Sequence, residues 1–131
     1  MTVNELYNSA LELLALKNSD GSENEDCSDY SNRALGLVNL LLAETLWLDR
    51  IIKRDNGVMP VYVNETSAPL QCNDTLARAV LPYGLAALLV ADEDVAMHKL
   101  MTERYQNAAK TLKEEAGGTR HDITDCYRYN E

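Results

Sequence analysis

Apolar residues recur every three or four positions along most of the chain, and this spacing predicts about four helices. The first covers about 3–17, where Thr2 and Glu5 match a capping box that satisfies free backbone N–H groups. The others cover about 30–55, with Asp29 as a candidate cap, about 74–91, capped by Asn73 or Asp74, and about 94–116. Leu and Ala dominate the apolar residues, which favours helix over strand.

The second predicted helix is apolar on nearly every face between residues 34 and 48. One side carries Leu35, Val38, Leu42 and Leu46, and another carries Leu37, Leu40, Leu41 and Leu48. A helix that is apolar all round is buried on several sides. Two interpretations stay open and can both hold: it is the central core helix, or neighbouring subunits bury part of it.

Two segments between the helices break the helical pattern. Residues 18–28 are polar, acidic and contain a glycine, which predicts an exposed loop. Residues 58–72 contain Pro60, Pro69 and the alternation Val61-Tyr62-Val63, which predicts an extended arm or a short β-hairpin between helices 2 and 3. The expected fold is therefore all-α, with about four helices in an antiparallel bundle-like arrangement.

The third predicted helix contains Pro82, which removes a backbone donor and predicts a kink or a restart. Gly84, Ala86 and Ala87 are small and allow neighbouring helices to approach closely. The acidic turn 92–94 caps the next helix, and Gly117-Gly118 is expected to end it. The chain then consists of a single helical domain, 1–118, and a flexible C-terminal tail, 119–131.

The net charge and the cysteine content limit the kinds of partner and the environment that fit this chain. The 131 residues carry a net charge of −9, which argues against sequence-specific nucleic-acid binding and against anionic membranes. Residues 34–48 contain Asn39 and Glu44 and are too few to span a bilayer, and the first residues lack the basic region of a signal peptide. Cys27, Cys72 and Cys126 lie far apart, which favours reduced thiols in a cytoplasmic setting.

Few residues in the sequence indicate catalysis or metal binding. His98 sits beside Lys99 on a polar helix face and is expected to be solvated, and His121-Asp122 would need further ligands to hold a metal. The acidic residues between 20 and 29 do not follow the order of a calcium-binding EF-hand loop. Nucleophile and phosphate-loop motifs are absent from the sequence. We therefore expect no catalytic, metal-binding or cofactor-binding residues and no enzymatic activity.

The stretch LPYGLAALLVADED, residues 81–94, carries a resemblance to a known family. Together with Ala68-Pro69-Leu70, Arg104-Tyr105 and Ile123-Thr124-Asp125-Cys126-Tyr127, it resembles the head–tail connector, or adaptor, proteins of long-tailed bacteriophages and prophages. The similarity covers about residues 68–127, and the first half matches only in helical layout. Cys126 and the residue after Tyr127 depart from the family's tail pattern.

The resemblance implies a helical, non-enzymatic protein that forms a ring under the portal and joins the capsid to the tail. It implies contacts with identical subunits, the portal protein and a tail-completion protein, in the host bacterial cytoplasm before assembly and in the virion neck afterwards. The candidate assembly residues are Val61, Tyr62, Val63, Leu37, Leu40, Leu48, Ile123, Tyr127 and Tyr129. The alternative is a small cytoplasmic helical module that binds one partner through a groove, and a more remote one is a metal-dependent enzyme.

Overall fold

Six helices form the part of the chain that this computed structural model describes, residues 1–15 and 28–128, with side chains described at 1–15 and 30–117. They are α1 (Val3–Leu13), α2 (Ser28–Glu44), α3 (Leu46–Lys53), α4 (Asp74–Ala79), α5 (Leu81–Leu89) and α6 (Val95–Arg128). The described residues contain no strand, only a single antiparallel bridge between Thr2 and Pro69. The all-α prediction is confirmed. Residues 58–72, which we call the arm, contain no helix and turn at residues 64–67.

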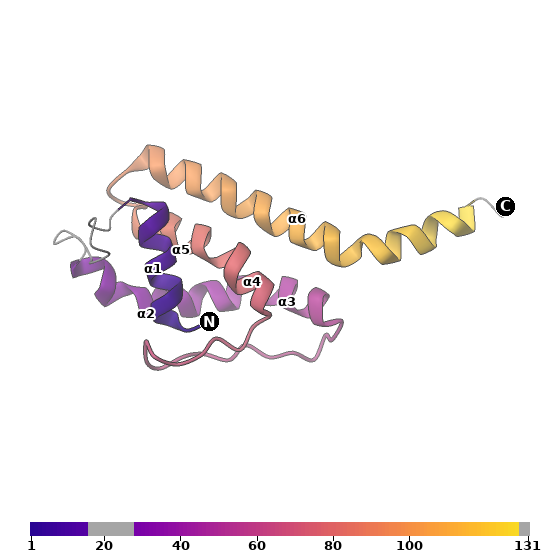
Figure 1. Cartoon of the computed structure of the whole chain (residues 1–131), viewed down its shortest axis with the longest axis horizontal. Coiled ribbons are helices and arrows are strands. Elements are labelled where there is room, and N and C mark those ends of the chain that lie inside the picture. The colour runs from indigo at the N-terminus through magenta and orange to yellow at the C-terminus, as the bar shows by residue number, and fades with distance from the viewer. Residues whose placement is uncertain (16–27, 129–131) are drawn as a thin grey trace.

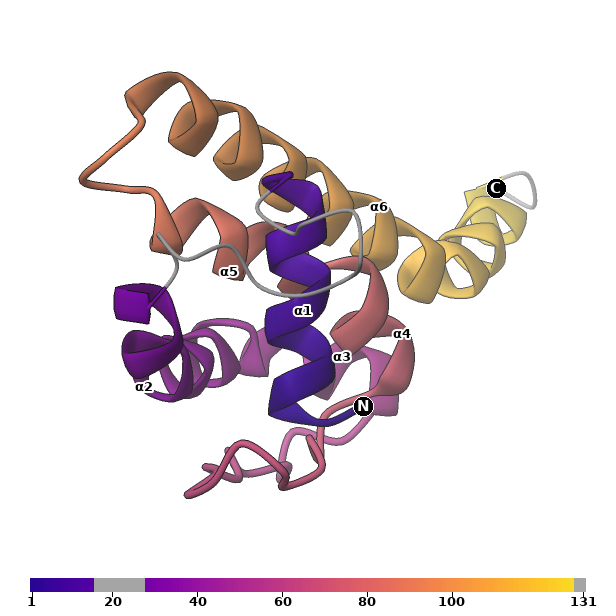
Figure 2. The ribbon, with the colours of Figure 1, turned by 60° about the vertical axis from the view of Figure 1, so that its left-hand side comes forward.

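Helix α5 lies at the centre of the molecule. It packs against α1, α2, α4 and α6, and Leu81, Leu85, Ala86 and Leu89 are completely buried. Figures 1 and 2 show α6 along one edge of the molecule, α2, α3 and the arm along the opposite edge, and α5 between them. The core is therefore built around α5, while α2 covers one of its sides.

The second predicted helix is two helices, because the chain leaves helical geometry at Thr45. The Thr45 hydroxyl donates to the Leu41 carbonyl at 2.8 Å, and the Thr45 backbone N–H donates to the same oxygen at 2.9 Å. A threonine bonded back to the preceding turn often bends a helix, and this side chain is buried. The chain is already helical at Ser28, so Asp29 lies within α2 and is not its cap.

The third predicted helix is also two helices, with a restart at Pro82 as predicted. Val80 separates α4 from α5 at φ −114° and ψ −51°, and Pro82 is the second residue of α5. A proline in the first turn removes an N–H that has no partner within its own helix. Gly84 confirms the predicted close approach: a Cβ atom there would lie 2.8 Å from Leu41 Cδ2 and 3.0 Å from the Tyr105 ring.

Helix ends follow local chemistry in several places. Thr2 Oγ1 accepts from the Glu5 backbone N–H at 3.2 Å, while the Glu5 carboxylate bonds the Thr2 hydroxyl instead of its N–H. Asp94 Oδ1 accepts from the Met97 N–H at 3.0 Å, which confirms it as the cap of α6. The first helix is shorter than predicted, because Ala15 adopts a left-handed φ of 57°.

The predicted end of the last helix at Gly117-Gly118 is wrong. Helix α6 has 34 residues, continues to Arg128 and measures about 50 Å at 1.5 Å per residue. Each glycine lowers helix stability by about 1 kcal/mol but does not forbid the conformation. Residues 119–128 of the predicted tail are thus helical, and Figure 1 shows this end of α6 bending and projecting past the other helices. Residues 129–131 lie outside the described part of the chain.

Candidate assembly surface

The arm is held against α2 and α3 by side chains that bond its backbone. Asn39 Nδ2 donates to the Val63 carbonyl at 3.0 Å, and Asn39 Oδ1 accepts from the Val63 N–H at 2.9 Å. Arg50 Nε donates to the Val58 carbonyl at 2.9 Å. The amide of Asn39 therefore bonds Val63 as a neighbouring strand would, and the arm runs antiparallel to the two helices.

These two attachment points explain why the arm is extended. Along the helices, residues 39 and 50 are separated by about 16 Å at 1.5 Å per residue. Along the arm, residues 58 and 63 are separated by about 16 Å at 3.3 Å per residue. An extended segment from Val58 to Val63 therefore has about the length needed to reach both points.

Four apolar side chains on this edge remain exposed to solvent. Leu40, Met59, Val61 and Tyr62 are between 51% and 69% exposed, and we call them the arm surface. The backbone N–H groups of Met59, Val61 and Tyr62 have no hydrogen bond to the residues that the structure describes. The arm surface is therefore apolar and sterically open.

Two of the predicted assembly residues belong to the core instead. Leu48 on α3 is completely buried, and Val63 in the arm is 4% exposed, because both side chains face the core. Leu37 is partly buried against the core. Ile123 and Tyr127 lie on the helical backbone of α6 but their side chains are outside the described set, as is the whole of Tyr129.

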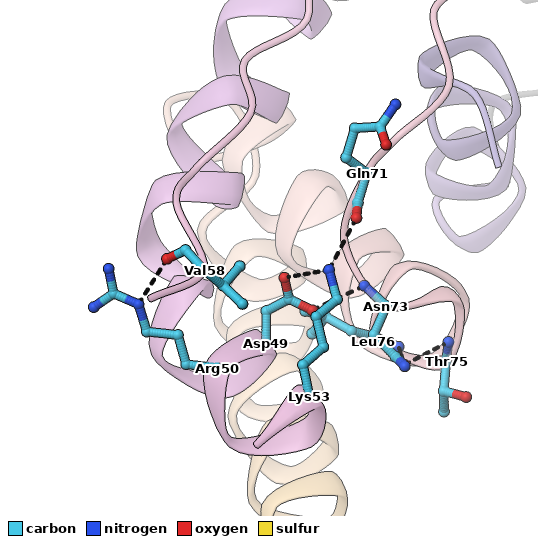
Figure 3. Close-up of polar contacts among 8 residues, drawn as sticks. All are labelled: Asp49, Arg50, Lys53, Val58, Gln71, Asn73, Thr75 and Leu76. Atoms are coloured by element: carbon cyan, nitrogen blue, oxygen red, sulfur yellow. Dashed lines mark hydrogen bonds and ion pairs between the residues drawn. The ribbon is translucent and has the colours of Figure 1, made fainter. Parts of the chain in front are cut away.

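A buried polar network fixes the far end of the arm to α3 and α4 (Figure 3). Asp49 is 4% exposed, accepts from the Asn73 N–H at 2.9 Å and pairs with Lys53 at 3.1 Å. Lys53 also donates to the Gln71 carbonyl at 3.1 Å, and Asn73 caps α4 as predicted. This role of Asp49 was not predicted from the sequence, in which the available signal was a carboxylate four residues before a lysine in an apolar helix.

Cys72 lies between these bonded residues and is partly buried. Burial, and to a lesser extent the nearby Asp49 carboxylate, raise the pKa of its thiol to about 11 against the opposing effect of Lys53. The thiol is therefore protonated at neutral pH, in which form it is a poor nucleophile.

The opposite edge of the molecule has its own exposed apolar residues, at the start of α6. Val95 is 77% exposed and Leu100 is 40% exposed. Ala96 is exposed beside them, and the acidic residues 92–94 immediately precede this turn. We call Val95, Ala96 and Leu100 the α6 surface.

His98 is not the solvated side chain that the sequence predicted. Its Nδ1 lies 2.8 Å from the Ala87 carbonyl, and because a carbonyl only accepts, Nδ1 carries the proton. On the same side, the Tyr30 hydroxyl donates to the Glu93 carboxylate, and Arg33 donates to the Leu89 carbonyl at 3.1 Å. These bonds fix the turn between α5 and α6.

A groove of about 340 Å³ lies between α3 and α6, lined by Glu44, Thr45, Trp47, Tyr105, Gln106, Ala109, Lys110 and Lys113. Trp47 is 46% exposed, with the Lys113 ammonium 6.0 Å from its ring centre. The Tyr105 hydroxyl donates to Glu44 at 3.1 Å, and burial together with this carboxylate raises the pKa of Tyr105. An aromatic ring beside two lysines can contact another protein.

In the part of the chain that the structure describes, no three His, Cys, Asp or Glu side chains are grouped closely enough to hold a metal ion. Within the same residues, each helix is too short or too polar to cross a bilayer.

Comparisons with known proteins add no relative. No family model, no curated protein and no solved structure matches the chain.

Proposed function

We propose that this chain is a structural head–tail adaptor of a long-tailed bacteriophage or prophage. It would form a ring of identical subunits under the portal, join the capsid to the tail and contact a tail-completion protein. This role requires no catalysis and no cofactor. It places the chain in the host bacterial cytoplasm before assembly and in the virion neck afterwards.

The observation that carries the proposal is the placement of the LPYGLAALLVADED stretch. These residues form α5 at the centre of the core and the acidic turn that starts α6. The stretch that resembles the adaptor family is therefore the part of the chain that organises the fold. Support also comes from α6, whose far end projects past the other helices and is available to a partner (Figure 1).

Binding to the cognate portal protein tests the proposal. The full chain is mixed with purified portal rings, and the bound fraction is measured by co-sedimentation. We expect the full chain to bind and a variant lacking residues 119–131 to bind more weakly. A variant with Asn107→Ala, on an exposed position of α6, serves as the control that should bind normally. Absence of binding by the full chain would contradict the adaptor role.

The groove at Trp47 favours one alternative, a helical interaction module that binds a single partner. The exposed ring and Lys110 and Lys113 fit an acidic peptide with an apolar anchor. Under this alternative, Trp47→Ala abolishes binding of the partner. The unsubstituted chain then does not bind portal rings. Under the adaptor role, portal binding occurs, and this outcome separates the two.

A further inference from the structure

The arm surface and the α6 surface lie on opposite edges of the same molecule (Figures 1 and 2). Leu40, Met59, Val61 and Tyr62 are exposed on one edge, and Val95 and Leu100 on the other. A molecule with two different apolar surfaces on opposite edges can bind its own copies head to tail. A self-pairing of two identical surfaces would leave the other surface exposed.

The net charges of the two ends differ in sign. Residues 49–55 at the end of α3 carry Arg50, Lys53 and Arg54 against Asp49, which pairs with Lys53, and Asp55, so three cations outweigh two carboxylates. Residues 92–100 at the start of α6 carry the carboxylates of Asp92, Glu93 and Asp94 against Lys99. Pairing either surface with itself brings like charges together, whereas pairing one with the other brings opposite charges together.

The two surfaces also differ in backbone structure, since one lies mainly on a non-helical segment and the other on a helix, and this suits a heterologous contact. The backbone of the arm is held at Val58 and Val63, on either side of Met59, Val61 and Tyr62. The α6 surface lies on the first turns of a helix whose buried side packs through Met101 on the core. Neither surface must reorganise before it binds, which lowers the entropic penalty of association.

We propose that the arm surface of one copy packs against the α6 surface of a second copy, with the basic end of α3 facing the acidic turn 92–94. This inference rests on the proposed function, because it identifies the surfaces that join neighbouring subunits of the ring. Each copy then uses both surfaces, one for each neighbour. The projecting end of α6 stays outside this contact.

Two variants of the full chain test the contact. The arm variant carries Met59→Asp and Val61→Asp, and the α6 variant carries Val95→Asp and Leu100→Asp. All four positions are exposed, so both variants are expected to fold, which circular dichroism and cooperative urea unfolding verify. Sedimentation velocity follows self-association up to about 1 mM, where even weak contacts are populated.

We expect the wild-type chain to associate in a concentration-dependent way and each variant alone to associate at least about tenfold more weakly. An equimolar mixture of the two variants restores one contact, because the intact arm of one meets the intact α6 surface of the other. The mixture therefore forms dimers and nothing larger. A monomeric wild-type chain, or a mixture that stays monomeric, overturns the proposal.

Milder substitutions and the portal assay complete the test. Val61→Ser and Val95→Ser leave the charge unchanged and should each weaken association by a few-fold; no change in either overturns the contact. If the mixture fails to pair while the wild-type chain binds portal rings, the contact is wrong and the adaptor role stands. If the mixture pairs and portal binding is absent, the adaptor role is wrong and the contact stands.

Discussion

Helix α5 and the apolar part of α2, residues 34–44, have very different surroundings. The α5 helix packs against four other helices, and Gly84 lets α2 and α6 approach closely. The α2 helix contributes Val38 and Leu41 to the core, yet Leu40 is 61% exposed, and nothing lies within 4 Å of the Cβ position of Gly36. The comparison teaches that a small residue brings helices together only where it faces a neighbouring helix.

The largest expected difference between the two helices comes from removing one leucine from each. Leu85→Ala in α5 should lower the free energy of unfolding by about 2–5 kcal/mol, because it leaves a cavity in a core that is filled on all sides. Leu40→Ala in α2 removes the same atoms from a solvent-exposed position and should change the free energy of unfolding by less than about 0.5 kcal/mol. Urea unfolding monitored by circular dichroism measures both. Equal effects would show that α5 is not the better packed helix.

Adding a methyl group to each helix tests the same comparison in the opposite direction. Gly84→Ala should destabilise the fold by about 1–3 kcal/mol, because the new Cβ atom meets Leu41 and Tyr105 at 3.0 Å or less. Gly36→Ala in α2 is the matched control, since nothing lies within 4 Å of its Cβ position. It should stabilise the helix by up to about 1 kcal/mol. The midpoint temperatures of thermal unfolding of the two variants should shift in opposite directions. A stabilising Gly84→Ala would contradict the close approach of the helices at Gly84.

A smaller effect is expected where α2 holds the arm. Asn39→Ala removes both hydrogen bonds to the Val63 backbone and should cost about 1–2 kcal/mol. The exposed Asn107 of α6 provides the control, because Asn107→Ala should be nearly neutral. Hydrogen exchange followed by NMR should show faster exchange of the Val63 amide in the first variant alone. Unchanged exchange would mean that the arm is held by other contacts.

The smallest effect concerns how well the arm covers Cys72. Its pKa is raised from 9.0 to about 11, so the native thiol stays protonated between these values while the unfolded thiol ionises. This contribution to stability is complete below pH 9 and is lost as the pH rises through 11. In a chain with Cys27→Ser and Cys126→Ser, alkylation by iodoacetamide should keep accelerating up to about pH 11 when folded, but level off near pH 9 in urea. Identical profiles would show that Cys72 is not shielded.

Local chemistry was sufficient to predict several elements of the fold. Thr2, Asn73 and Asp94 cap helices because a polar side chain before an apolar repeat can satisfy free N–H groups within a few residues. Pro82 marks a restart because its ring has only local consequences. Such features depend on neighbours in the sequence, so the sequence is enough to find them.

Features that depend on distant contacts could not be predicted in this way. Thr45 ends α2 although threonine is tolerated in helices, and Asn39 binds a backbone 24 residues further along the chain. Gly117 lies within α6 because its weak helix propensity is outweighed by the helix on either side. Of the residues assigned to one assembly surface, Val61 and Tyr62 are exposed, whereas distant packing contacts bury Val63 and Leu48.

The length of α6 has a mechanical consequence. Its backbone is helical without interruption from the turn beside α5 to Arg128, so a load applied to the projecting end is transmitted along the helix axis to the centre of the core. Side chains shield the helix backbone least at Gly117 and Gly118, which makes this the point of lowest bending stiffness. The molecule thus combines an axially stiff rod with one compliant joint, outside the region where Met101 and Leu112 anchor the rod to the core.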